Sequence, residues 1–225
     1  MTQVRRFGEG PLSRLAAGVY TLLIVELMVL TTTLPGLVPL ILLERDPSNI
    51  PLVALCLLPL GPSVSAALYA LQHRSSDLTD LQPAVAFWRG YRTNLVGVLK
   101  LWTPLLLWLT IVAVNLANFG AAGVPAWWAV PMVVIAVVAT LAGINALVIT
   151  SLFSFRSRDV ARLGLYFLWR AKAVALGNAC LLIVAAGLTV LFSEVIVAMF
   201  GSLFALALLR NARPMVALIQ KEFVA

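Results

Sequence analysis

Long apolar runs separated by short polar segments dominate this chain of 225 residues. A helix needs about 20 apolar residues to cross the hydrocarbon core of a bilayer. Hydrophobic residues make up 62% of the chain and charged residues 11%, whereas soluble domains are roughly half apolar and about a quarter charged. We therefore predict an all-α integral membrane protein, folded as one polytopic domain over residues 1–225.

The lengths of the runs predict six transmembrane helices. The last apolar stretch, residues 173–209, would form a helix about 55 Å long, too long for a hydrocarbon core about 30 Å thick. Two short spans that meet at Phe192-Ser193-Glu194 fit this stretch better. The predicted spans are residues 15–34, 50–72, 95–119, 127–153, 173–191 and 195–209.

The distribution of positive charge predicts the orientation of these spans. In the six-span arrangement, all of the 16 Lys and Arg residues except Arg45 fall on the side of the N-terminus. Lys and Arg accumulate in cytoplasmic loops, so both termini are expected in the cytoplasm. Because the cations cluster between apolar runs, we attribute the net charge of +7 to orientation in a lipid bilayer and expect no nucleic-acid partner.

Two polar segments on the predicted cytoplasmic side have the pattern of short helices that lie in the headgroup layer. The first carries an apolar stripe at helical spacing, a capping-box pair and a first-turn proline: Leu78, Leu81, Val85 and Trp88, then Thr79 with Gln82, and Pro83. The second, residues 156–172, carries a polar stripe of Asp159, Arg162, Tyr166 and Arg170. Each segment ends in a Trp–Arg pair, Trp88 with Arg89 and Trp169 with Arg170. These pairs either contact a partner protein or anchor the segment to anionic headgroups.

The second span is interrupted by Pro59, Gly61 and Pro62. Each proline lacks a backbone N–H and leaves a carbonyl one turn earlier without its helical donor. A helix that restarts at Pro62 would point its first amides, with the hydroxyls of Ser63 and Ser65, into the bundle. Broken helices of this kind form substrate sites in transporters. The alternative is a kinked structural helix whose polar groups are satisfied by neighbouring helices.

Glu26 is the one ionisable residue deep inside a predicted span, about midway along the first. An intramembrane acid marks a candidate functional site, here for a proton, a cation or sugar hydroxyls. The structural alternative is a protonated Glu26 bonded to another helix, with Asn115, Asn145 and Asn178 as candidate partners. We hypothesise that Glu26 and the restarted half-helix line one polar cavity. The candidate substrate-binding residues are Glu26, Gly61, Ser63 and Ser65.

The sequence contains no nucleophile elbow, phosphate-binding glycine loop, paired His–Glu zinc motif or suitably spaced acid pair. Cys56 and Cys180 each lie in an apolar run without a ligand-spaced companion, and we interpret both as buried hydrophobic residues. We therefore expect no enzymatic activity, no cofactor and no metal site.

Two stretches resemble the YesL-like family of small bacterial integral membrane proteins. They are Leu58–Tyr69, with its Gly-Pro helix start, and Phe87–Asn94, an aromatic-basic-Asn entry into the next span. Phe200-Gly201-Ser202 resembles the family as well. This chain departs from the pattern in a longer stretch between Pro35 and Pro59, and at Glu26, where family members more often carry Asn.

The resemblance implies a bacterial plasma-membrane protein with a domain of unknown function. Members of this family tend to be encoded beside oligosaccharide importers and glycoside hydrolases. This implies an accessory role in carbohydrate uptake, in which the chain binds laterally to importer subunits. The alternative is a small stand-alone transporter or channel that uses the broken second helix and Glu26.

Overall fold

The computed structural model describes residues 11–74, 82–121, 123 and 125–224, and these residues form helices joined by turns, with no β-strand among them. Six segments are long and apolar enough to cross a membrane: Leu15–Leu42, Pro47–Gln72, Pro83–Ala117, Ala126–Leu152, Lys172–Leu191 and Gly201–Phe223. The predicted number of spans is confirmed, and these segments indicate a multi-pass helical membrane protein.

The first helix, α1 (Pro11–Leu42), is longer than the predicted span of residues 15–34. Pro35 and Pro39 both lie inside it, so the helix continues beyond residue 34, where the predicted span ends. Proline is tolerated in membrane helices where neighbouring helices fix the backbone. Here Gly36 lies so close to the Cys56 carbonyl that a Cβ would not fit, and this approach holds the last turns of α1 against α2.

The second span is broken as predicted. A 3-10 turn, η1 (Pro47–Asn49), leads into α2 (Ile50–Cys56), and α3 (Leu60–Gln72) follows after a tight turn. The helix restarts at Leu60 rather than at Pro62. Pro62 therefore occupies the first turn of α3, where its missing N–H leaves no helical hydrogen bond unmade.

The third span belongs to α4, a continuous helix of 35 residues from Pro83 to Ala117. It begins at Pro83, and Gln82 precedes it as an N-cap without a side-chain hydrogen bond, whereas the capping-box pair predicts Gln82 inside the first turn. Val85 and Trp88 lie in this same helix, so the helix begins well before residue 95, the predicted start of the span. Gly90 packs directly on the Tyr69 side chain of α3, and this contact holds the first turns of α4 against the bundle. Three residues of the predicted amphipathic stripe and capping box lie outside the described residues, namely Leu78, Thr79 and Leu81.

The C-terminal half contains η3 (Ala126–Trp128), α5 (Ala129–Leu152), α6 (Ser157–Arg170), α7 (Lys172–Leu191), α8 (Glu194–Met199), α9 (Gly201–Ile219) and a last π-helical turn, η4 (Gln220–Val224). The expected break after residue 191 is confirmed. The predicted sixth span of residues 195–209 does not coincide with one helix, because α8 is a separate short helix and α9 runs past Arg210 and Arg213. Long arginine side chains can reach away from the apolar layer, so they do not end a helix.

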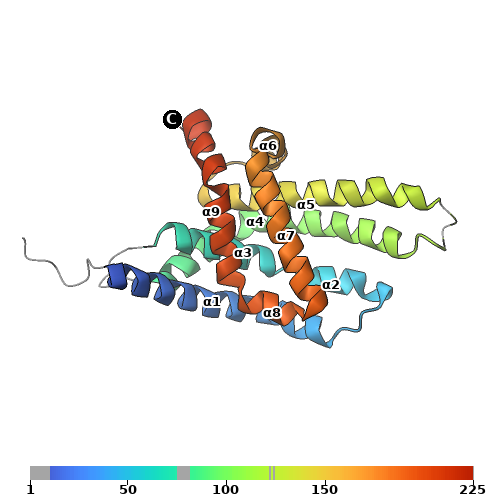
Figure 1. The fold of residues 1–225 in the computed structure, drawn as a ribbon, viewed down its shortest axis with the longest axis horizontal. Coiled ribbons are helices and arrows are strands. Elements are labelled where there is room, and N and C mark those ends of the chain that lie inside the picture. Colours follow the sequence, from blue (N-terminus) through green and yellow to red (C-terminus); the bar gives the residue numbers. More distant parts are fainter. Residues whose placement is uncertain (1–10, 75–81, 122, 124, 225) are drawn as a thin grey trace, which may run out of the picture.

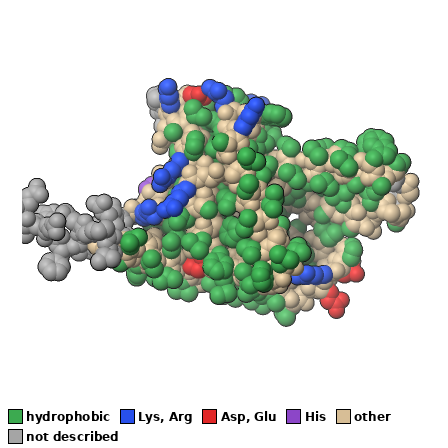
Figure 2. Space-filling view, viewed as in Figure 1, with side chains coloured by type: hydrophobic (Ala, Val, Ile, Leu, Met, Phe, Trp, Pro, Cys, Tyr) green, Lys and Arg blue, Asp and Glu red, His purple; other side chains and the backbone are tan. Residues whose placement is uncertain are grey.

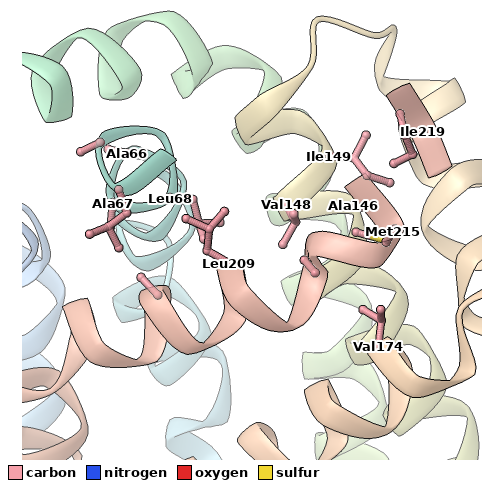
Figure 3. Close-up of a cluster of buried hydrophobic side chains, with 14 of the residues drawn as sticks. Ala66, Ala67, Leu68, Ala146, Val148, Ile149, Val174, Leu209, Met215 and Ile219 are labelled. Carbon is pink, nitrogen blue, oxygen red and sulfur yellow. The ribbon is translucent and has the colours of Figure 1, made fainter. Parts of the chain in front are cut away.

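The helices form two sets that cross each other (Figure 1). α1, α3, α4 and α5 run along the long axis, while α7 and α9 cross them steeply. α8 joins the ends of α7 and α9 next to α1, and α6 lies at the opposite end of α7. The hairpin of α4 and α5 extends beyond α7. Small and branched side chains from α3, α5, α7 and α9 fill the crossing, as Figure 3 shows for Ala66, Leu68, Val148, Val174 and Met215.

Candidate functional site

The break between α2 and α3 is covered by Trp102 of α4. The indole N–H of Trp102 donates to the Leu57 carbonyl at 3.0 Å, and the Leu60 N–H donates to the same oxygen at 3.2 Å. Gly61 makes this approach possible, because a Cβ at residue 61 would lie 2.6 Å from Cγ of Trp102. A neighbouring aromatic side chain thus satisfies one of the polar groups at the break.

The two serines after the break bond to neighbouring helices. Ser63 Oγ lies 2.9 Å from Thr32 Oγ1 on α1 and 2.7 Å from the Pro59 carbonyl oxygen. Ser65 Oγ lies 2.8 Å from Ser151 Oγ on α5, and the Asn94 amide donates to it at 3.3 Å. Both serines are fully buried. Their hydroxyls therefore connect α3 to α1, α4 and α5.

Glu26 bonds to the first turn of α9. Its Oε2 accepts the Ser202 N–H at 2.7 Å, and its Oε1 accepts the Gly201 N–H at 3.2 Å. The residue before this helix, Phe200, supplies no side-chain cap. A carboxylate at a helix N-terminus satisfies free amides and complements the helix dipole. Glu26 is thus a cap supplied by another helix, and the expected asparagine partners are wrong.

Three asparagines form a separate chain of hydrogen bonds through the crossing of α5, α7 and α9. The Asn211 amide donates to Asn178 at 2.8 Å, and the Asn178 amide donates to Asn145 at 2.9 Å. Asn145 in turn donates to the Gly164 carbonyl of α6 at 3.2 Å. Asn145 and Asn178 are fully buried. Four helices are thereby joined through amide groups in an otherwise apolar interior.

A cavity of about 870 Å³ lies between α1, α2, α7, α8 and α9. Its walls are mostly apolar, and Gly61 and Asn178 line it. Charged residues line it near the α1–α2 connection: Glu44, Arg45, Asp46 and Glu194. Arg45 and Glu194 form an ion pair with a 3.7 Å N–O distance. Glu26, Ser63 and Ser65 are not among its lining residues, so the structure does not bring the candidate residues together around one polar cavity.

The charged end of this cavity contains an Asx-type turn. The hydroxyl and the backbone N–H of Ser48 bond to the carboxylate of Asp46, and these bonds hold the pKa of Asp46 below its usual range. The Ser48 backbone nitrogen lies 2.8 Å from Oδ1 of Asp46. Asp46 caps η1 in this way and fixes the connection between α1 and α2.

The two Trp–Arg pairs lie on the surface. Trp88 packs edge-on against Tyr91, with ring centroids 5.6 Å apart, while Trp169 is 78% exposed near the end of α6. Arg89 and Arg170 are both exposed. These positions suit contacts with headgroups or with a partner protein.

No group of three His, Cys, Asp or Glu side chains suited to a metal ion occurs in the part of the chain that the structure describes. Cys56 is half-buried at the cavity wall, and Cys180 is exposed on α7. The expectation that both cysteines are buried is therefore wrong. An apolar membrane helix carries such residues on its outer face as readily as on its inner face.

Sequence reasoning missed Trp102 and Asn211, and it named Asn94 only as part of the stretch that resembles the YesL-like family. Each is a hydrogen-bonding side chain in or beside an apolar run, where an unpaired polar group is costly. This pattern indicates a bonded partner, but the partner's identity depends on how the helices pack.

Comparison with known proteins finds one family whose model matches part of the chain. Residues 21–116 match the model of a family described as "Protein of unknown function, DUF624". Neither a curated protein nor a solved structure matches the chain. The matched region runs from within α1 to near the end of α4, and it includes Glu26, the helix break and Trp102. The match over residues 21–116 is consistent with the resemblance to the YesL-like family.

Proposed function

We propose that this chain is an integral membrane accessory protein that binds laterally to a carbohydrate importer. The link to carbohydrate uptake comes from the YesL-like resemblance. The structural support is that the interior polar groups bond to one another. Across the described residues, Ser13 Oγ is the one buried side-chain N or O atom without a hydrogen-bond partner. An oligosaccharide path needs polar groups that are free to bind hydroxyls, and the large cavity is mostly apolar.

The proposal places the protein in a bacterial plasma membrane with both termini in the cytoplasm and α6 in the headgroup layer. The charge distribution supports this orientation, because Lys and Arg prefer cytoplasmic loops. Arg45, the one cation expected outside, pairs with Glu194 at the α7–α8 turn. Two of the three connections expected outside, the one after α1 and the one after α7, are thus adjacent in space. In Figure 2 most of the visible cations lie at the top and on the left side of the molecule, and one further group lies at the lower right.

The projecting hairpin of α4 and α5 offers the lateral surface. Its outer parts extend beyond α7 (Figure 1) and expose apolar side chains, among them Ile111 and Val134. A lipid-facing position tolerates a larger apolar side chain, because lipid tails rearrange around it. A packed protein interface does not, since added volume forces atoms into contact.

Copurification tests this proposal. The full chain is expressed with the importer of its genomic neighbourhood, and importer subunits should copurify with it in mild detergent. The variants Ile111→Trp and Val134→Trp should lose the subunits while remaining folded. Ile183→Trp on the exposed face of α7 is the matched control and should retain them. If the subunits never copurify, the proposal fails.

A stand-alone transporter or channel is the second candidate function. One observation favours it, namely that Gly61, beside the helix break, and Gly201, which donates to Glu26, both line the cavity of about 870 Å³. Flux measurements in liposomes containing the chain alone distinguish the two functions. Solute uptake that is lost in Gly61→Val would support the transporter, whereas no flux with intact importer binding would support the accessory protein.

A further inference from the structure

A second, smaller pocket lies where the end of α3 approaches α9. Its volume is about 400 Å³. Three arginine side chains line it, Arg74 from the turn after α3 and Arg210 and Arg213 from α9. Gln72 and Gln220 contribute amide groups. In Figure 2 a group of cationic side chains is visible where α3 and α9 approach each other in Figure 1.

The charges in this pocket are unbalanced. No Asp or Glu is among the described residues that line it, and the one ion pair among the described residues joins Arg45 and Glu194 elsewhere. Arg210 and Arg213 are three residues apart on one helix face, so their like charges repel. An anion between α3 and α9 would remove this repulsion. Guanidinium groups bind phosphate oxygens through paired, charge-assisted hydrogen bonds.

The apolar part of the pocket indicates the source of the anion. Leu71 and Leu209 are buried, Leu206 and Val216 are half-buried, and all four line the pocket beside the arginines. Toward its N-terminus α9 continues as an apolar helix with Leu203 exposed. A soluble phosphate would leave this apolar wall unused. A phospholipid places its headgroup on the arginines and its acyl chain along α9.

We propose that Arg74, Arg210 and Arg213 form a binding site for an anionic phospholipid headgroup, in the leaflet on the cation-rich side of the protein. Basic pockets between helices on the cytoplasmic side of membrane proteins bind such headgroups. The amide groups of Gln72 and Gln220 donate to the remaining phosphate or glycerol oxygens. This site is independent of the proposed accessory function, because it uses neither the α4–α5 hairpin nor the large cavity.

The test measures lipid binding to the full chain in neutral detergent by native mass spectrometry. Phosphatidylglycerol, phosphatidylcholine and inorganic phosphate are titrated separately. Phosphatidylglycerol should bind, with the other two ligands much weaker. Arg210→Gln with Arg213→Gln should weaken binding about 25-fold, about fivefold for each cation. Arg156→Gln with Arg158→Gln removes the same charge outside the pocket and should leave binding unchanged.

Two further variants keep the test decisive. Arg210→Lys with Arg213→Lys should restore a large part of the affinity, because the charge is retained. If the glutamine pair fails to fold, the single variant Arg74→Gln, at the exposed helix end, should still lose about fivefold in affinity. Equal binding of phosphatidylcholine, equal binding of inorganic phosphate, or unchanged affinity in the pocket variants would each overturn the proposal.

Discussion

Glu26 on α1 accepts the backbone N–H of Ser202, the second residue of α9, at 2.7 Å. The bond joins residues 176 positions apart and attaches the N-terminal helix to the last one. An acid in the middle of a span is thereby explained by the start of another helix. It also gives a structural role to Phe200-Gly201-Ser202, a stretch that resembles the YesL-like family.

The cap predicts a stability effect at Glu26. Glu26→Ala leaves the amides of Gly201 and Ser202 without their acceptor, which should cost about 1–3 kcal/mol. Glu26→Gln keeps one acceptor oxygen and should lose less. Thermal unfolding in detergent measures both variants. Equal melting temperatures for the wild type and the alanine variant would contradict the capping role.

The sequence shows that Glu26 lies inside a predicted span, but it does not identify the groups that bond to Glu26. A run of apolar residues with one acid predicts that the acid is bonded, since a free charge is costly in lipid. The partner is a backbone N–H, and every residue except proline has one. Only the packing of α1 against the junction of α8 and α9 selects Gly201 and Ser202.

Because Trp102 packs against Gly61 at the break between α2 and α3, a substitution at Gly61 should displace the Trp102 indole. Gly61→Ala places a Cβ 2.6 Å from the indole ring, so Trp102 must move and its hydrogen bond to Leu57 should be lost. The indole N–H signal of Trp102 in an NMR spectrum should shift, and the protein should be destabilised. Gly18→Ala is the matched control, because nothing lies within 4 Å of its added Cβ. An unchanged indole signal in Gly61→Ala would refute this packing.

Removing the indole N–H alone tests the bond itself. Trp102→Phe keeps an aromatic ring over Gly61 and deletes the donor to Leu57. The Leu57 carbonyl retains the Leu60 N–H, so the loss should be modest, about 0.5–1.5 kcal/mol. Chemical or thermal unfolding of the two proteins measures it. A loss as large as that of a core cavity would mean that Trp102 acts mainly by packing.

The helix boundaries show a second difference between sequence and structure. Pro59 lies in the turn that interrupts the second span, yet Pro35 and Pro39 lie inside α1 without ending it. The residue type is the same in all three places. Near Pro35 the close contact of Gly36 with α2 fixes the backbone, whereas at Pro59 the Trp102 indole satisfies a carbonyl of the turn. Neighbouring helices decide between these outcomes, so the sequence predicts the number of spans better than their ends.

The asparagine chain predicts coupling between α7 and α9. Asn178→Leu removes an acceptor from Asn211 and a donor from Asn145. Interhelical hydrogen bonds in membranes are worth about 0.6 kcal/mol on average and up to about 2. A double-mutant cycle of Asn178→Leu and Asn211→Leu should show coupling in this range. Asn118→Leu is the control, because the Asn118 amide bonds to Val114 of its own helix. Additive effects at residues 178 and 211 would exclude the chain.

The turn that Asp46 caps, at the charged end of the large cavity, should depend on pH because its hydrogen bonds need the ionised carboxylate. Its hydrogen bonds from the Ser48 hydroxyl and N–H lower its pKa from the usual 3.8. The sign follows from linkage: the charged form is favoured in the folded turn, so the bonds are complete above the usual pKa and are lost as pH falls through the lowered value. The Ser48 amide signal, followed by NMR, should titrate with a midpoint below 3.8. Asp46→Asn should abolish this titration, and a midpoint above the usual value would contradict the turn.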